Sequence, residues 1–444
     1  MKAKLAPVYF KDAGMNEKFN EQLERLKDLL EDEADILKPF QLGTTVPDEA
    51  DAVLFPQLLG EAYERVEEIQ EIDKPRLILT SEFGTFAMWD WEIITFMRSK
   101  GIEMIAPYDI SQTKMLCDAL KAKRKLSQSK FIVYQDKPGE DGQQDPIFKR
   151  FYWWEDDCID KMEEKFGLAI DKRSFKELGT RAQNKPDSDV KGVLDDLTID
   201  VSENLTNDAL IRALKVYQAV KEDVEEEGSV AGVGINCLNE SKYSDTTPCL
   251  AWNLLYEEKE LIWACEGDIM TLITEYLVNK TLDAPVMMSN IYPFLMGRAA
   301  LDHEGIPNFP EIVDNPDDHI LMAHCGYLGV LPESFSTEWT LRPKVLEIVD
   351  DNSHAIDARF PEGEVTLVKV GPSMEKIMAI EGNLKGYVQY PGTDCRNGAI
   401  IEVEDGHEVM NRAYSHHQIL VPGHRGRDIE TIVGKIMDLE VEVL

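Results

Sequence analysis

The chain has 444 residues, which is too long for a single hydrophobic core and predicts two or three domains. Its 83 acidic against 47 basic residues give a formal net charge of -36, so nucleic acid and anionic membrane surfaces are excluded as expected partners. The seven cysteines form no CxxC pair, the first residues are too polar for a signal peptide, and no stretch has the apolar length of a membrane span. We therefore expect a protein of the reducing cytoplasm.

The first third of the chain alternates short apolar runs with amphipathic segments. The runs that we predict to be strands cover residues 7–10, 52–56, 77–80, 104–107 and 131–135. Helical spacing lies between them, for example at residues 16–30. This alternation predicts a doubly wound parallel sheet in an N-terminal α/β domain of residues 1–175. No glycine-rich phosphate loop follows any of these strands, which argues against a dinucleotide-dependent oxidoreductase.

Two further domains are predicted downstream. Residues 176–335 continue the strand and helix alternation and predict a second doubly wound α/β domain, in which residues 250–256 and 261–265 form a hairpin or neighbouring strands. Residues 336–444 change to a period of two with frequent turn signals, which predicts a C-terminal antiparallel β-rich domain. The expected class is thus α/β, with two parallel-sheet domains followed by a β-rich one.

Three polar side chains follow apolar runs in the second predicted domain. They are Glu266, Asn290 and His324, and each comes directly after a run that we predict to be a buried strand. Strands joined through helices are usually parallel neighbours, and α/β sheets bind their ligands at the carboxyl ends of such strands. The three side chains are therefore expected to converge at one edge of one sheet, unless His324 is simply a buried, hydrogen-bonded histidine.

Asp268 stands two residues after Glu266 and directly before an amphipathic segment, residues 269–278. An aspartate in that position is usually the N-cap of the following helix. The alternative is a functional role beside Glu266. Cys325 has no second cysteine nearby, which favours a structural thiol over a metal ligand.

A second signal is Ser415-His416-His417-Gln418, at the entry to a short apolar run. Successive side chains of a strand point to opposite faces, so we expect only one of the two histidines to face a given site. One imidazole combined with Glu266 would make a site of mixed oxygen and nitrogen ligands. That combination suits Mn²⁺ or a similar divalent ion better than a closed zinc site of cysteines.

These motifs resemble the family of L-fucose isomerase and L-arabinose isomerase. The segment Cys265-Glu-Gly-Asp268 is similar to the fucose enzyme, which implies that Glu266 is the first metal ligand. The end of the chain, from Ser415-His-His-Gln-Ile-Leu to Leu439-Glu-Val-Glu-Val443, is similar to the arabinose enzyme and implies a ligand role for His417. His324 stands where the arabinose enzyme has another ligand. The order of two α/β regions and one β-rich region also fits.

The resemblance implies a metal-dependent aldose-ketose isomerase that acts on a free sugar through an ene-diol, with Mn²⁺ or another divalent cation as cofactor. It also implies a homo-oligomer, since family members assemble with active sites near subunit contacts. Glu266 is then both metal ligand and base. Substrate contacts are expected from His416, Asp268 and Tyr327, the last two being candidates to move the second proton.

Asn290 departs from the family pattern. The fucose enzyme has an aspartate in this place that binds the metal and moves protons, and the resemblance makes Asn290 its counterpart in both roles. An amide oxygen can coordinate a cation weakly, but an amide is neither an acid nor a base at neutral pH. The alternative function is therefore a homologue that binds a sugar without isomerising it.

Overall fold

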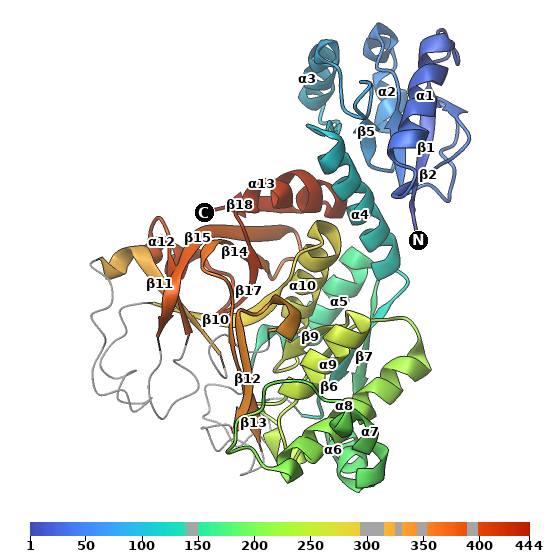
Figure 1. The fold of residues 1–444 in the computed structure, drawn as a ribbon. Coiled ribbons are helices and arrows are strands. Elements are labelled where there is room, and N and C mark those ends of the chain that lie inside the picture. Colours follow the sequence, from blue (N-terminus) through green and yellow to red (C-terminus); the bar gives the residue numbers. More distant parts are fainter. Residues whose placement is uncertain (138, 140–149, 294–314, 325–330, 344–352, 389–397) are drawn as a thin grey trace. The chain divides into compact units, whose positions relative to one another are not determined.

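The computed structural model describes residues 1–137, 139, 150–293, 315–324, 331–343, 353–388 and 398–444 (Figure 1). The chain divides into two compact units. Unit 1 contains Met1–Lys125, Lys280–Leu282 and Asp428–Leu439, and unit 2 contains Leu126–Asn279, Asp283–Arg427 and Glu440–Leu444. None of the helices in the described part has the length and apolar character needed to cross a membrane.

Unit 1 is built on a parallel β-sheet. Its strands are β1 (Ala3–Tyr9), β2 (Ala34–Ile36), β3 (Phe40–Gln41), β4 (Ala52–Phe55) and β5 (Arg76–Ile78). They pair in the order β2-β1-β4-β5, with β3 beside β1. Its helical segments are α1 (Glu17–Leu29), η1 (Gly60–Glu64), α2 (Val66–Gln70), η2 (Met88–Asp90), α3 (Trp91–Ser99), α4 (Ile110–Leu126), the π-helix η9 (Ile429–Gly434) and α14 (Lys435–Met437).

The sequence pattern explains most of unit 1. Helix α1 starts where the Asn16 side chain caps the backbone N–H of Phe19, and Phe19 packs edge-on against Tyr9 of β1. The predicted strand at residues 104–107 is reduced to one parallel bridge between Ile105 and Leu77. A parallel sheet for the first region is confirmed, although its strands end at β5.

Unit 2 begins with a second parallel sheet. Its strands are β6 (Lys130–Tyr134), β7 (Ala169–Arg173), β8 (Val230–Ile235) and β9 (Ile262–Cys265), in the order β7-β6-β8-β9. The accompanying helical segments are η4 (Tyr152–Trp154), α5 (Asp156–Phe166), α6 (Phe175–Asn184), η5 (Asp187–Asp189), α7 (Lys191–Asp195), α8 (Asn207–Glu227), η6 (Ser241–Tyr243), α9 (Cys249–Lys259) and α10 (Ile269–Leu282).

Two predictions for this region are wrong. Because β6 pairs with β7 and β8 and not with β5, the first domain ends near residue 125 and not at residue 175. Residues 250–256 lie in helix α9 and not in a strand. Seven of the first eight side chains of α9 are buried, so this part of its sequence is almost wholly apolar and lacks the helical period that marks a half-exposed helix.

The remainder of unit 2 is mainly a β-barrel. Its strands are β10 (Met287–Pro293), β11 (His319–Ala323), β14 (Gly363–Val370), β15 (Lys376–Val388), β16 (Gly398–Glu402), β17 (His417–Pro422) and β18 (Glu440–Val443). They pair in the order β14-β17-β10-β11-β16-β15-β18, and the pairing of β14 with β15 closes the barrel. The other segments are β12 (Glu338–Pro343), which pairs with β13 (His354–Arg359), and η7 (Pro316–Asp318), η8 (Glu333–Phe335), α12 (Gly406–Arg412) and α13 (Gly426–Asp428).

The barrel corrects a central expectation. Strands β10 and β11 are not parallel neighbours of β9, because they pair antiparallel with each other and with β17 and β16. The β-rich region therefore starts before residue 336. A short apolar run predicts a buried strand but carries no information about its partner. The broad class, parallel α/β sheets followed by an antiparallel β-rich region, is confirmed.

Candidate metal centre

Glu266 directly follows β9 in a tight turn. Glu266 and Gly267 both have left-handed backbone conformations, with φ of 58° and 63°. The N–H of Gly267 donates to the carbonyl of Ile235 in β8 at 3.0 Å, and the indole Nε1 of Trp154 donates to the carbonyl of Glu266 at 3.1 Å. A left-handed glutamate is unfavourable, and such strain concentrates at functional sites. The turn thus holds a buried carboxylate at the carboxyl end of the parallel sheet.

Asp268 is both a helix cap and the centre of a buried polar network. Its Oδ1 accepts the backbone N–H of Thr271 at 2.9 Å, which makes it the N-cap of α10. Its Oδ2 accepts three donors: the Thr271 hydroxyl at 2.8 Å, the Lys369 ammonium at 3.2 Å and the Nδ1 of His417 at 2.7 Å. Burial alone would raise the pKa of Asp268, but Lys369 and His417 lower it well below its ordinary value. Asp268 is therefore an anion.

His417 is placed by the strand register of the barrel. It lies opposite Asn290 in the β17–β10 pair, and Asn290 lies opposite Ala323 in β11. Directly opposite residues of antiparallel strands project from the same face, so Asn290 and His417 are neighbours. Asp268 binds Nδ1 of His417, which leaves Nε2 at 3.5 Å from Oε1 of Glu266. This is the orientation of a metal-ligating histidine with a carboxylate behind it.

Glu266, His416 and His417 form a group that could hold a metal ion. One ligand atom from each lies within 4.8 Å of the others; Glu266 and His417 are buried and His416 is more exposed. Only one of the two histidines was expected to face the site, and that expectation is wrong. Strand β17 begins at His417, so the alternation of a strand does not govern His416. The two rings lie 4.1 Å apart between centroids.

Two buried atoms beside this group test whether a cation fits. The Nε2 of His417 and the Oδ1 of Asn290 are both buried and have no hydrogen-bond partner among the described residues. The Nδ2 of Asn290 donates to the hydroxyl of Tyr292 at 3.1 Å, so the amide oxygen points away from that hydroxyl. Leaving a buried hydrogen-bonding atom unpaired costs about 1–3 kcal/mol. A cation bound by Glu266 and a deprotonated His417 would give Nε2 a partner, and Asn290 lies opposite His417 in the strand pair, so the donor set fits a divalent ion.

The charges describe the metal-free site, in which His417 carries a proton that a bound metal ion would displace. Burial alone would lower the pKa of His417, but Glu266 and Asp268 raise it to about 9. Burial and the neighbouring charge of His417 lower the pKa of His416 to about 3, so that ring is neutral and its nitrogen lone pair is available. Burial would raise the pKa of Glu266, but His417 lowers it below its ordinary value. Glu266 is thus ionised at neutral pH.

The other predicted site residues fare differently. His324 is buried at the end of β11, and its ring centroid lies 6.5 Å from that of His417, so it borders the group without belonging to it. Asp268 is fully buried behind His417, where it orients the ring and is shielded from any substrate. Tyr327, predicted to bind substrate, and Cys325 lie outside the described residues.

Sequence reasoning missed an aromatic wall and a buried lysine. The ring centroid of Trp153 lies 5.2 Å from that of His417 and 6.0 Å from that of His416, and Phe151 stacks on Trp153 at 4.4 Å. The run Phe151-Tyr-Trp-Trp154 is a visible sequence signal for this wall. Lys369 had no such signal, because a single lysine in a strand ordinarily faces solvent.

No family model matches this chain, and a search of curated proteins found no match either.

Proposed function

We propose that this protein is a divalent-metal-dependent aldose-ketose isomerase of the L-fucose and L-arabinose isomerase type, acting on a free sugar. One observation carries the proposal: Glu266, from the end of a parallel strand, and His416 and His417, from the far end of the chain, bring their ligand atoms within 4.8 Å of one another. The resemblance assigns Glu266 and His417 to metal ligands, and His416, expected there to contact substrate, joins them in the group. Mn²⁺ is our choice of ion, because carboxylate, amide and imidazole ligands suit it.

The residues divide the chemistry between them. Isomerisation moves a proton from the carbon beside a carbonyl to its neighbour through an ene-diol. A divalent ion bound by Glu266, His416 and His417 would supply stabilisation of the negative charge that develops on the substrate oxygens. We assign Glu266 as the base, since its carboxylate is ionised and buried. Asp268 holds the His417 ring in place.

A neutral, polyhydroxylated substrate agrees with the surroundings of the site. The aromatic wall of Phe151 and Trp153 offers an apolar surface beside the histidines, on which the C–H face of a sugar can pack. The net charge of -36 gives no long-range attraction for a phosphorylated sugar. The proposed substrate is therefore an unphosphorylated aldose.

Asn290 favours a second candidate function, a homologue that binds metal and sugar without isomerisation. Its amide donates to the hydroxyl of Tyr292 and acts as neither an acid nor a base at neutral pH. Asp268 is a poor substitute as the second acid, because it is fully buried and already accepts four hydrogen bonds. The binding function requires only the metal group and the aromatic wall.

One experiment separates the two functions. The purified protein is loaded with Mn²⁺, analysed for bound metal, and assayed for ketose formation on a panel of pentoses and 6-deoxyhexoses. Turnover of any sugar establishes the isomerase. Bound Mn²⁺ with no turnover on any sugar favours the binding protein, and a protein that binds no metal contradicts both.

Asn290→Asp sharpens that experiment. A carboxylate in this place would add a charged ligand and a group that can carry a proton, so we expect higher Mn²⁺ affinity, higher isomerase activity, or both. Isothermal titration with Mn²⁺ and the same sugar panel measure the change. Values at or below wild type for both quantities would contradict the assignment of Asn290 to the site.

A further inference from the structure

We propose that Lys369 and Thr271 are positioning residues for the metal site, because their hydrogen bonds to Asp268 fix the direction in which the His417 ring presents its Nε2 atom. This inference rests on the proposed metal-binding function. It assigns a role to two buried residues that touch none of the metal-binding side chains.

Lys369 reaches the site from the barrel. It follows Val368, which pairs with Ile419 of β17, so it lies on the strand next to the one that carries His417. Its side chain is fully buried, and its Nζ donates to the Thr271 hydroxyl at 2.7 Å and to Oδ2 of Asp268 at 3.2 Å. A buried ammonium is costly unless it is paired, so Lys369 and Asp268 hold one another in place.

Thr271 contributes a hydroxyl that both donates and accepts a hydrogen bond. It donates to Oδ2 of Asp268 and accepts from Lys369, while its backbone N–H donates to Oδ1 of the same carboxylate. Both carboxylate oxygens are thus engaged, and rotation of the Asp268 carboxylate would break several bonds at once. Of the donors to Asp268 in the described part of the chain, His417 alone is also a ligand candidate, and its ring orientation follows from the Nδ1 bond at 2.7 Å.

The same helix and strand provide a matched control. Thr274 is also fully buried on α10, and its hydroxyl donates to the carbonyl of Met270 at 2.7 Å and accepts the backbone N–H of Val370 in β14 at 3.1 Å. It ties α10 to β14 about one turn beyond Thr271. A role in packing alone would make Thr271 and Thr274 equivalent, whereas a positioning role belongs to Thr271 only.

The experiment compares Thr271→Val, Thr271→Ser and Thr274→Val. The first variant keeps the shape and removes the hydroxyl, the second restores the hydroxyl, and the third removes the control hydroxyl. Mn²⁺ affinity is measured by isothermal titration on folded protein, and the ring nitrogens of ¹⁵N-labelled histidines are followed by NMR in the metal-free state. We expect Thr271→Val to lose about 10–100-fold in affinity, as for other residues behind a metal ligand. Thr271→Ser and Thr274→Val should stay within about twofold of wild type, well below that range.

Lys369→Met is expected to act in the same direction as Thr271→Val, provided that the variant folds. Should it not fold, the threonine series still decides. Wild-type affinity in Thr271→Val, or an equal loss in Thr274→Val, overturns the positioning role and leaves the metal function standing.

Failure of the metal function has a separate signature. If wild-type protein binds no Mn²⁺, the proposed function falls, and the NMR signals alone decide the positioning role. A changed His417 ring signal in Thr271→Val that is restored in Thr271→Ser supports it. An unchanged signal overturns it.

Discussion

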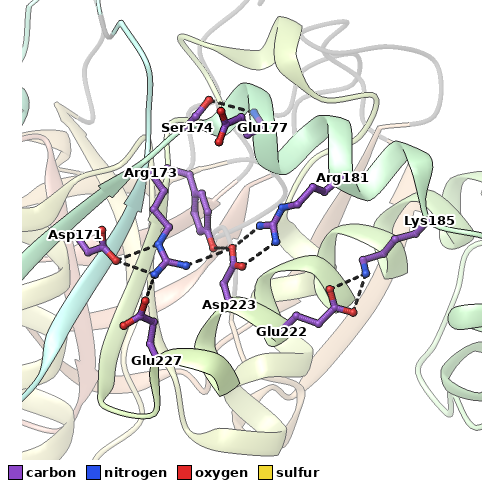
Figure 2. Close-up of polar contacts among 10 residues, drawn as sticks. Asp171, Arg173, Ser174, Glu177, Arg181, Lys185, Glu222, Asp223 and Glu227 are labelled. Carbon is purple, nitrogen blue, oxygen red and sulfur yellow. Dashed lines mark hydrogen bonds and ion pairs between the residues drawn. The ribbon is translucent and has the colours of Figure 1, made fainter.

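Two buried aspartates in unit 2, Asp223 and Asp268, lie at the centres of polar networks. Among the described residues, the first network leaves no buried atom unpaired, and the second does. Asp223 on α8 accepts the hydroxyl of Tyr134 and both terminal nitrogens of Arg181, and Arg173 lies 3.7 Å away (Figure 2). Arg173 is also paired with Asp171 and Glu227. No side-chain atom of Asp223, Tyr134, Arg173 or Arg181 is buried without a partner.

Asp268 accepts hydrogen bonds from three residues, but its network contains buried atoms that have no partner. Beyond His417, the Nε2 of that ring and the Oδ1 of Asn290 have no hydrogen-bond partner among the described residues. Satisfied buried networks stabilise a fold, whereas a buried group without a partner calls for an explanation, of which a bound ion is one. Asp223 is thus expected to serve stability alone, and Asp268 to serve a ligand site.

The largest expected difference is in metal binding. Glu266→Gln and His417→Ala each remove a ligand atom, and each should lower Mn²⁺ affinity by more than about a hundredfold, beyond the range for residues behind a ligand. Asp223→Asn should bind Mn²⁺ as wild type does, because it lies in the satisfied network. Metal content after dialysis and isothermal titration measure both. If His417→Ala kept the wild-type affinity for Mn²⁺, the network of Asp268 would not serve a metal site, and it would not differ in role from that of Asp223.

The metal-free protein should lose stability in mild alkali. The folded state raises the pKa of His417 from 6.5 to about 9, so the stability it contributes is complete below pH 6.5 and is lost as pH rises through 9. The contribution is on the order of 3 kcal/mol. Urea unfolding in chelator from pH 6 to pH 9.5 measures it. In His417→Gln the corresponding fall should be absent, and an equal fall in that variant would contradict the assignment.

A smaller effect is expected at Asp223. Asp223→Asn leaves Arg181 and Arg173 without their shared carboxylate, which should cost about 2 kcal/mol, less than for a wholly buried pair because Arg181 is 45% exposed on its side chain. The folded state lowers the pKa of Asp223 below 3.8, so its contribution is present above pH 3.8 and lost as pH falls through the folded value. Urea unfolding at pH 7 and in acid tests this, and a difference that persists in strong acid would contradict it.

Several residues of the site were predictable from short sequence patterns. Glu266 at a strand end, Asp268 before an amphipathic helix and the His416-His417 pair are short-range signals, and all three fall in the site. The regular alternation of strand and helix likewise predicted the parallel sheets.

What could not be predicted depends on partners that are distant in the sequence. Lys369 lies between two valines in a strand, and only the closure of the barrel against α10 places it beside Asp268, 101 residues away. Asn290 meets His417 through antiparallel pairing, and a run of apolar residues gives no strand direction. His416 joins the group because β17 starts one residue later, a boundary too fine for pattern reasoning.

The left-handed backbone of Glu266 lowers the conformational stability of the chain at a candidate metal ligand. Any side chain with a Cβ costs roughly 1–2 kcal/mol in that conformation, and glycine does not. Glu266→Gly is therefore expected to unfold at a higher urea concentration than Glu266→Ala, although both lack the carboxylate. If conformational stability were the only requirement, glycine would be favoured at position 266, beside Gly267. Glutamate in this turn lowers the free energy of unfolding, and folding does not require it.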